Sequence, residues 1–269
     1  MKNVKNAVVL ITGGGSGIGR LMALDFAERG ARVVIWDLNA EALKLAQEEA
    51  AGRGLSIRGM VCDISNRQEV YAQAERLTGE MGPVDILINN AGIVQGKPML
   101  ETPDDLIEKT MRVNVLPLFW TAKAFLPAMI TRNSGHIVTI ASAAGLIGVR
   151  RLTDYCASKF AAVGFNESIR MELRRTGIRT TVACPFFIDT GMFSGVKTRF
   201  PLLLPILKSS QAAKKIVRAV LKNKELLIMP PLAGSTLILR LFPPRLLDAV
   251  ADFFGINHAM DEFKGRDGQ

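Results

Sequence analysis

The stretch Ala7-Val8-Val9-Leu10-Ile11-Thr12-Gly13-Gly14-Gly15-Ser16-Gly17-Ile18-Gly19 predicts how the first part of this chain folds. Its first six residues form an apolar, largely β-branched run that is typical of a buried strand. Glycines follow, and the chain then continues in a helical pattern through Leu24 and Ala27. A glycine turn between a strand and a helix lets the backbone approach a pyrophosphate, whose charge is favoured by the free N–H groups of the helix N-terminus.

The glycines at 13, 17 and 19 have the spacing Gly-x-x-x-Gly-x-Gly, and a loop of this kind can also be a plain tight turn. The flanking sequence favours the dinucleotide interpretation. Arg32–Trp36 has the pattern of a second strand, and Asp37 follows it 20 residues after Gly17. An acid at this place binds the ribose hydroxyls of adenosine. It would repel a ribose phosphate, and no basic residue at Ser16 or Leu38 could receive one, so the sequence favours NAD over NADP.

A tyrosine and a lysine lie four positions apart in Asp154-Tyr155-Cys156-Ala157-Ser158-Lys159. If residues 153–176 form a helix, the two side chains share one face, with an ammonium beside a phenol. A fixed cation favours the phenolate, so we expect Lys159 to lower the pKa of Tyr155. An isolated Tyr-x-x-x-Lys is more often a surface tyrosine over a lysine stem. The other motifs of this chain favour the catalytic interpretation.

Together these motifs resemble those of the short-chain dehydrogenase/reductase family over nearly the whole chain. The matching segments are Thr12–Gly19, Cys62-Asp63-Ile64, Asn89-Asn90-Ala91-Gly92 and Pro185–Thr190. One departure is Phe186, which stands where the family usually has glycine. The resemblance implies a catalytic tetrad of Asn114, Ser142, Tyr155 and Lys159. It implies cofactor contacts by Gly13, Ser16, Gly17, Ile18, Gly19, Asp37, Asp63, Ile64, Asn90, Tyr155, Lys159, Pro185, Ile188 and Thr190.

Longer strings resemble one branch of this family, the retinol dehydrogenases and lipid-associated hydroxysteroid dehydrogenases. They include Asp154–Phe160, Val163–Phe165, Asp189–Phe193 and Phe263–Arg266. Members of that branch oxidise or reduce alcohol and carbonyl groups on large apolar molecules. The resemblance therefore implies a retinoid, a steroid or a long-chain alcohol as the type of substrate. Substrate identity transfers poorly between relatives, because the fold fixes the reaction while the pocket fixes the molecule.

The resemblance implies a role for each member of the tetrad. In the oxidative direction Tyr155 would take the alcohol proton while Ser142 holds the oxygen. Lys159 would also bind the nicotinamide ribose, and Asn114 would hold the water through which the proton leaves. Taken alone, Ser142 is equally a turn residue at a strand end, and Asn114 a capping or turn residue. A non-catalytic NAD(H)-binding interaction or sensor protein on the same fold remains the alternative function.

Length and periodicity predict one Rossmann-type α/β domain over residues 1–269. Strand-like runs alternate with helical segments, as in a doubly wound parallel sheet, and they lack strict polar alternation because both faces are buried. Within this domain, residues 191–256 are expected to form a substrate-side lid that includes a C-terminal apolar segment. The family also implies a homo-oligomer, either dimer or tetramer. The predicted strands are 7–12, 32–36, 57–62, 84–89, 136–141, 180–184 and 226–229.

Several chemistries are disfavoured by composition. His136 and His258, the only two histidines, lie outside any metal-ligand motif, which argues against a zinc site and against histidine-based hydrolysis. The three cysteines form no C-x-x-C pair and suit reduced, buried thiols in a cytoplasmic protein. The first ten residues show no signal-peptide pattern, because their short apolar run continues into the first strand. At 6% aromatic residues, with no recognised module, the chain gives no indication of nucleic-acid binding.

The net charge of +9 is concentrated between Lys197 and Lys224. This stretch either forms a solvated helix face with no partner, or it attracts a partner, which would be anionic lipid or an acidic protein. Farther on, residues 232–242 are apolar, and residues 245–256 repeat apolar side chains at helical spacing. This segment is too short to span a bilayer and is interrupted by Pro243-Pro244. It either packs on the core or on another subunit, or it roofs a lipophilic pocket and rests peripherally on a membrane surface.

Overall fold

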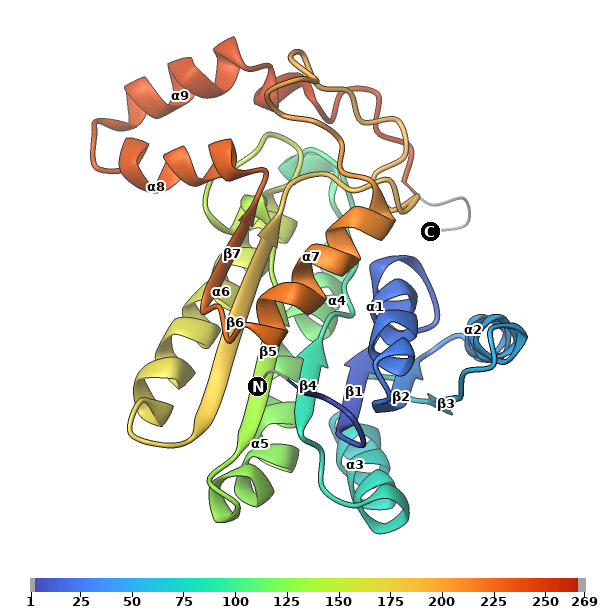
Figure 1. The fold of residues 1–269 in the computed structure, drawn as a ribbon. Helices are drawn as coiled ribbons and strands as arrows, with labels where there is room; N and C mark the ends of the chain where they lie inside the picture. The colour runs from blue at the N-terminus through green and yellow to red at the C-terminus, as the bar shows by residue number, and fades with distance from the viewer. Residues whose placement is uncertain (1–2, 266–269) are drawn as a thin grey trace.

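A computed structural model describes residues 3–265, and it contains one parallel sheet covered by helices on both faces (Figure 1). All seven predicted strands are present, and their order across the sheet is β3-β2-β1-β4-β5-β6-β7. Their bounds are β1 Val8–Thr12, β2 Arg32–Asp37, β3 Ile57–Val61, β4 Ile86–Asn89, β5 Gly135–Ile140, β6 Ile178–Pro185 and β7 Leu226–Met229. The predicted Rossmann-type doubly wound fold is confirmed.

The helices connect the strands and pack against the sheet, with α1, α2 and α7 on one face and α3, α5 and α6 on the other. Four short 3₁₀ turns lie at 99–101, 143–145, 231–234 and 256–258. The helix bounds are α1 Gly17–Glu28, α2 Ala40–Gly52, α3 Arg67–Met81, α4 Asp104–Asn114, α5 Leu116–Thr131, α6 Thr153–Leu173, α7 Ser209–Leu221, α8 Ser235–Leu239 and α9 Pro244–Phe253.

The central strand β1 shows why its sequence is apolar throughout. Val9 and Ile11 belong to the core cluster under α1 and α7, whereas Val8 and Leu10 belong to the cluster under α3 and α5. Successive side chains of a strand point to opposite faces, so a strand covered on both sides needs apolar residues at every position. The strands are all parallel, but successive strands are added on one side of β1 as far as β3 and on its other side from β4 onwards. Ligands of such sheets bind beyond the strand carboxyl ends at this switch point.

One helical stretch in the described part of the chain, Asp104–Thr131, is long and apolar enough to cross a membrane by length and composition alone. It comprises α4 and α5. The structure places α5 against α3, β4 and β5, and α4 against α6. In the most apolar window 44% of the residues are buried inside the protein. Such packing is that of core helices in this domain.

The basic stretch divides between two environments. In α7 the apolar residues Ile216, Val217 and Val220 are buried against α1, while Lys214, Lys215 and Arg218 lie on the outer side. This is the solvated-face arrangement considered above. Lys197 and Arg199 lie instead in the loop that leads from β6 towards α7, beside the C-terminal segment.

Candidate active site

A long cleft lies beyond the carboxyl ends of β1, β4, β5 and β6, with about 1540 Å³ of space when the open solvent at its mouth is counted. Every residue that the resemblance assigned to the cofactor lines this one cleft. Ser142 of the predicted tetrad lines it as well, whereas Asn114 lies behind its wall. Residues from sequence positions 13 to 190 thus meet at one edge of the sheet.

The glycine loop leaves room that side chains would fill. Gly13 has a φ of +62°, and a Cβ there would stand 2.8 Å from the Cα of Ala91. A Cβ on Gly19 would stand 2.1 Å from the carbonyl oxygen of Gly13. Both positions therefore require glycine. α1 starts at Gly17 without an acidic residue in its first turn, and the Ser16 hydroxyl makes no capping hydrogen bond within the described chain. This backbone cradle at an uncapped helix start fits a pyrophosphate.

A clasp holds the glycine loop to the end of β4. The hydroxyl oxygen of Thr12 accepts hydrogen bonds from the backbone N–H groups of Asn90, at 3.0 Å, and Ala91, at 3.2 Å. In return the Asn90 side chain donates to the carbonyl oxygens of Thr12, at 2.9 Å, and Gly13, at 3.0 Å. Sequence reasoning placed Thr12 in the glycine motif and Asn90 in the cleft, but it did not find that they hold each other.

Two carboxylates that line the cleft, Asp37 and Asp63, are fixed by groups close to them in the chain or in the glycine loop. Asp37 accepts hydrogen bonds from the N–H groups of Gly15 and Asn39, both at 3.0 Å. One oxygen of Asp63 accepts from both the backbone N–H and the hydroxyl of Ser65, at 2.9 and 2.7 Å. Asp37 therefore braces the glycine loop and also presents a held negative charge to the cleft.

Ser142 and Tyr155, two members of the predicted tetrad, both line the cleft. Ser142 follows β5, where its hydroxyl accepts the N–H of Ala144 at 3.1 Å and donates to the carbonyl of Pro185 at 3.4 Å. Tyr155, in the first turn of α6, is buried and hydrogen-bonds to the Ser142 side chain. Burial raises the pKa of Tyr155, and the bond to Ser142 lowers it. This net direction is opposite to the lowered pKa that we expected from Lys159 alone.

Lys159 lies one helical turn after Tyr155, as the spacing predicted. Its Nζ is 5.5 Å from the centroid of the Tyr155 ring and donates to the carbonyl of Ile140 at 3.0 Å. Burial lowers the pKa of Lys159 to about 8, with the neighbouring Cys184 acting in the opposite direction. The side chain therefore carries its charge at neutral pH, inside the cleft.

The Asn114 side chain is a structural connector at the end of α4. Its Oδ1 accepts the N–H of Ile93 at 2.8 Å, and its Nδ2 donates to the carbonyl of Ile93 at 2.9 Å and to the hydroxyl of Ser158 at 3.0 Å. Ser158 in turn donates to the carbonyl of Tyr155 at 2.7 Å. Both amide hydrogens of Asn114 are thereby used, whereas Oδ1 keeps a second lone pair that can accept a hydrogen bond from the relay water expected from the resemblance. Ser158 lies within the motif that contains Tyr155 and Lys159, but the sequence alone did not indicate its hydrogen bonds to Asn114 and Tyr155.

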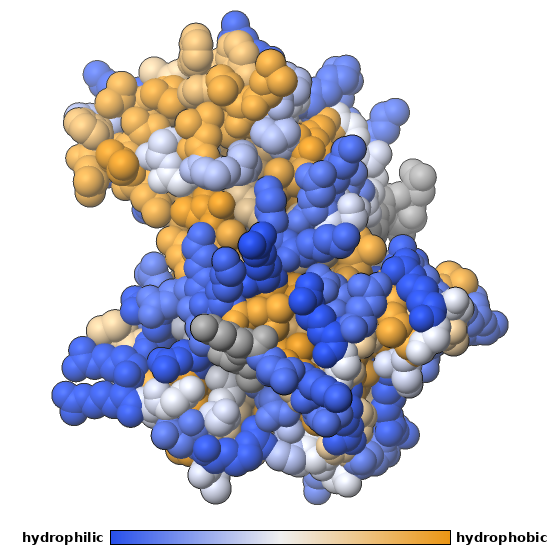
Figure 2. Space-filling view, viewed as in Figure 1, coloured by the Kyte–Doolittle hydropathy of each residue, from blue (hydrophilic) through white to orange (hydrophobic). Residues whose placement is uncertain are grey.

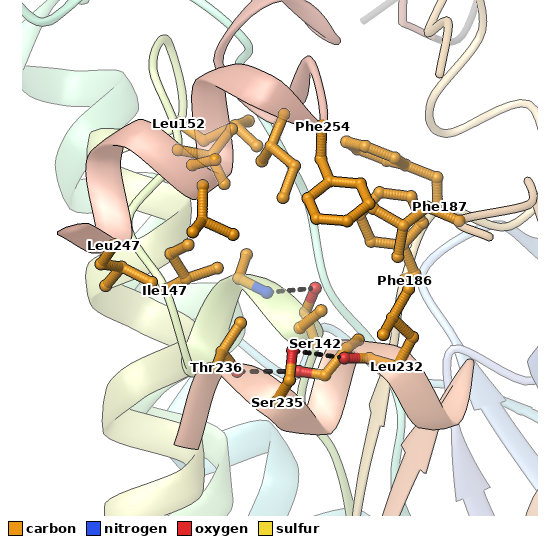
Figure 3. Close-up of a pocket in the computed structure, with 18 of the residues that line it drawn as sticks. Ser142, Ile147, Leu152, Phe186, Phe187, Leu232, Ser235, Thr236, Leu247 and Phe254 are labelled. Carbon is orange, nitrogen blue, oxygen red and sulfur yellow. Dashed lines mark hydrogen bonds between the residues drawn. The ribbon is translucent and has the colours of Figure 1, made fainter. Parts of the chain in front are cut away.

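A second, apolar cavity adjoins the cleft, with about 760 Å³ of space when the open solvent at its mouth is counted (Figure 3). Ser142 lies at its floor, with Phe186, Phe187 and Phe254 along one side and Ile147 along the other. Hydroxyls of Ser142, Tyr155, Ser235 and Thr236 are the polar side-chain groups among its lining residues. The cavity therefore suits an apolar molecule with an oxygen at one end.

The C-terminal segment roofs this cavity. Leu247 and Val250 line it from α9, Phe254 lines it from the residue after α9, and Leu239 lines it from α8. At the far end of α9, Phe253 stacks on Phe200 of the preceding loop with 5.4 Å between ring centroids. Residues 232–256 thus cover the apolar cavity, which is the roof of the second interpretation, while the contact with a membrane stays a prediction.

The outer surface of the roof is apolar too (Figure 2). Apolar side chains gather over α8 and α9 at the top of that view. Ile238 is 64% exposed, Leu241 84% and Phe253 60%, and Leu202 in the neighbouring loop is 99% exposed. We call this surface the terminal apolar face. It consists of Leu202, Leu203, Ile206, Leu232, Leu237, Ile238, Leu241, Phe242, Leu246 and Phe253.

The remaining titratable groups do not suggest another reaction centre. Among residues 3–265, no group of three or more His, Cys, Asp or Glu side chains could hold a metal ion. Cys62, Cys156 and Cys184 are free thiols and buried, as expected from their positions. Burial raises the pKa of each thiol, so none is poised as a thiolate. Arg266, the last residue of the branch-specific strings, lies outside the described residues.

Comparisons with known proteins agree with this geometry. A sequence profile of the short chain dehydrogenase family matches residues 7–199. Human epidermal retinol dehydrogenase 2 is 50% identical over 270 residues, which cover 97% of this chain and 86% of the relative. Human retinol dehydrogenase 10 is 41% identical, with the same coverage of 97% and 86%. A short chain dehydrogenase/reductase from Burkholderia phymatum, solved in complex with NAD, is 27% identical with a TM-score of 0.82, over 92% of this chain and 97% of that one.

Proposed function

This chain belongs to the short-chain dehydrogenase/reductase family, in its retinol dehydrogenase branch, and from that premise we propose that it transfers hydride between NAD(H) and an alcohol or carbonyl group on a large apolar molecule. One observation carries the proposal. The hydroxyls of Ser142 and Tyr155 lie where the dinucleotide cleft meets the apolar cavity, so both compartments share them. An oxygen held there has the cofactor cleft on one side and the apolar chain on the other.

The residues of the cleft fit a dinucleotide. The glycine loop and the uncapped start of α1 would hold the pyrophosphate, and Asp37 would accept the adenosine ribose hydroxyls. Lys159 would bond the nicotinamide ribose, and Pro185, Ile188 and Thr190 would line the nicotinamide end. The nicotinamide, when bound, supplies the two-electron hydride chemistry. A carboxylate at position 37 supports NAD over NADP, because a phosphate about 4 Å away costs about 1 kcal/mol even in water.

We assign proton transfer to Tyr155 and orientation of the substrate oxygen to Ser142. The bond between the two hydroxyls supports this, since the phenol can give or take a proton at the atom that Ser142 positions. Burial alone keeps Tyr155 protonated, so the charge of Lys159 has to favour the phenolate during oxidation. Asn114 and Ser158 hold the backbone of Tyr155 in place.

The apolar cavity supports a retinoid, steroid or long-chain alcohol as the substrate type. Its walls are leucine, isoleucine, valine and phenylalanine side chains. Two relatives that share 41–50% of their residues with this chain are named as retinol dehydrogenases. Such a cavity accepts a long or flat apolar molecule, because it offers few polar groups away from Ser142 and Tyr155.

An assay of kcat/KM with NAD and with NADP, across retinol, a hydroxysteroid, a long primary alcohol and 2-propanol, tests the proposal. We expect turnover of at least one of the large apolar alcohols with NAD and little with 2-propanol. Asp37→Ser should reduce the preference for NAD while leaving the choice of alcohol unchanged. Tight NAD binding without turnover of any alcohol or aldehyde would favour the non-catalytic sensor instead. Equal kcat/KM with NADP would overturn the cofactor assignment.

We also propose that the terminal apolar face rests peripherally on a lipid surface. Arg240 and Arg245 of this segment are offset by the exposed Asp248 and Asp252. Attraction to anionic lipid therefore has to come from the adjoining basic stretch between Lys197 and Lys224, whose Arg199 contacts Phe253 of the face. The same segments roof the cavity, so an apolar alcohol dissolved in lipid would stand next to its site. The enzyme would then work at the cytoplasmic surface of a membrane.

Self-association, as a dimer or tetramer, is proposed through the outer sides of α5 and α6. Leu116 and Phe119 in α5 are exposed, and Phe119 packs edge-on against Phe165 of α6. Exposed apolar side chains on adjacent helices are typical of subunit interfaces. Sedimentation equilibrium of the wild type and Phe119→Glu tests this: we expect an oligomer that the charge disrupts. A monomeric wild type would overturn it.

A further inference from the structure

The cofactor cleft and the apolar cavity share four lining residues, which therefore form the boundary between them: Ser142, Tyr155, Phe186 and Phe193. Two of them carry the hydroxyls assigned to the reaction. The other two, Phe186 and Phe193, carry phenyl rings to which the proposed reaction assigns no role. We call the opening between the two compartments the passage. A substrate must place its reacting carbon there, between two hydroxyl groups and two phenyl rings.

The aromatic half is held firmly. Phe193 meets the Tyr155 ring edge-on, with 5.8 Å between centroids, and packs on Phe187 at 5.1 Å and Phe263 at 6.4 Å. Phe186 packs on Phe187 at 4.6 Å, and its backbone N–H donates to the carbonyl of Met229 at 2.7 Å. Such edge-on contacts fix ring positions beyond what burial provides. Neighbouring rings thus brace both phenyl groups in the positions that they occupy.

The stereochemistry of an alcohol assigns a direction to each substituent of its reacting carbon. The oxygen points to Ser142 and Tyr155, the departing hydrogen points into the cofactor cleft, and the long carbon chain extends into the apolar cavity. The fourth substituent then points to the remaining side of the passage, which Phe186 and Phe193 occupy. Hydrogen fits beside two packed rings, whereas a carbon group requires one of them to move.

We propose that Phe186 and Phe193 determine specificity by excluding a second carbon substituent, so that the enzyme acts on primary alcohols and aldehydes in preference to secondary alcohols and ketones. This inference rests on the proposed function and narrows its substrate class. It also gives a role to Phe186, the position where the sequence departs from the family's usual glycine. Phe187, one residue later, lines the apolar cavity alone.

Two isomers, 1-dodecanol and 2-dodecanol, test the inference because they contain the same atoms and differ in the substitution of the reacting carbon. For the wild type with NAD we expect kcat/KM to be roughly tenfold or more higher for the primary isomer, the range that a pocket discriminates over one methyl group. Phe186→Gly and Phe193→Ala should each reduce this ratio at least threefold, mainly by raising kcat/KM for 2-dodecanol.

Ile147→Ala is the control. It removes an apolar side chain from the cavity wall on the side opposite the phenyl rings, so it should weaken both isomers alike and leave their ratio within twofold. Phe193→Leu keeps an apolar side chain against Phe187 and Phe263, and it reports on the ratio even if alanine loosens the loop. Turnover of both isomers with a ratio that none of the Phe186 or Phe193 variants changes would overturn the inference alone. If the enzyme turned over neither dodecanol isomer nor dodecanal, the proposed function would be wrong together with this inference.

Discussion

At the scale of single residues, the oxygen of Tyr155 is the atom on which turnover should depend. Tyr155→Phe keeps the ring that packs on Phe193 and removes the group that exchanges a proton. We expect turnover to fall by more than tenfold, about 1.4 kcal/mol of transition-state stabilisation, while NAD affinity stays near that of wild type. Steady-state kinetics and a fluorescence titration with NADH measure the two quantities. A variant that retains more than a tenth of the wild-type rate would exclude Tyr155 as the proton acceptor.

His136 should make the protein labile to acid. It is buried in β5, and its Nε2 lies 2.8 Å from the hydroxyl of Thr181. Because that hydroxyl donates its own hydrogen to the carbonyl of Lys224, His136 must donate from Nε2, which leaves Nδ1 without a partner in the described residues. Burial lowers the pKa of His136 to about 3.

A folded-state pKa below the unfolded value means that stability is complete above about pH 6.5 and is lost as the pH falls towards 3. Between pH 7 and pH 5 this group alone should cost about 2 kcal/mol of unfolding free energy. His136→Asn does not titrate in this range, so its stability should fall correspondingly less. Urea unfolding of both proteins at pH 7 and pH 5 measures the difference, and parallel losses would show that His136 is not responsible.

The residues that sequence could assign are those whose partners are close along the chain or belong to a motif. Tyr155 and Lys159 are one helical turn apart, so their proximity follows from the helix. Thr12 and Asn90 are 78 positions apart, and Asn114 and Ser158 are 44 apart. Pairs of that kind depend on strand order and helix packing, which local pattern does not contain. The raised pKa of Tyr155 likewise comes from burial, which only the assembled cleft reveals.

At the scale of elements, α8 and α9 should decide whether the protein meets lipid. Leu241 and Phe242 follow α8, are exposed and do not line the cavity. Replacing both with serine should reduce sedimentation with anionic vesicles several-fold and leave kcat/KM for a soluble short-chain primary alcohol nearly unchanged. Wild-type sedimentation should weaken at high salt, because the cations beside the face are exposed and screened.

Charge-matched replacements provide the control for this prediction. Leu45→Ser and Val61→Ser alter exposed apolar residues on the opposite, α2–β3 side of the sheet and should leave vesicle binding as it is. If wild type fails to sediment with vesicles at low salt, the lipid proposal is wrong. Replacing residues 232–256 by a polar linker should also remove the preference for long apolar alcohols, since that segment supplies much of the cavity wall.

The strands were the most predictable elements, whereas their order across the sheet came from the structure. Each begins near its predicted residue, because an apolar run bounded by glycine, proline or polar residues leaves few alternatives. The helix predicted for residues 153–176 ends three residues earlier, at Leu173. The loop from Gly191 to Leu207 was expected only as part of a lid. Its contact with α9 through Phe200 and Phe253 brings together residues 53 positions apart, and no periodic pattern indicates such a contact.

At the scale of the whole molecule, the dinucleotide should stabilise the fold, because its cleft is built from both halves of the sheet. Ligand at about 100 times its Kd adds roughly 2.7 kcal/mol to the unfolding free energy. For a domain of this size that corresponds to a rise in Tm of several degrees. Thermal unfolding with matched concentrations of NAD and NADP should show the larger rise with NAD, and Asp37→Ser should reduce the difference. A larger rise with NADP would contradict the assigned role of Asp37.

The contact between α1 and α7 has a consequence for how this protein is made. Met22 and Phe26 of α1 share one core with Ile216 and Val217 of α7, although nearly two hundred residues separate them. During translation the glycine loop and its helix leave the ribosome early and must wait, with one side uncovered, until α7 has also emerged. Nascent chains arrested before residue 209 should therefore recruit chaperones and fail to retain NADH, whereas chains with α7 fully outside the exit tunnel should bind it.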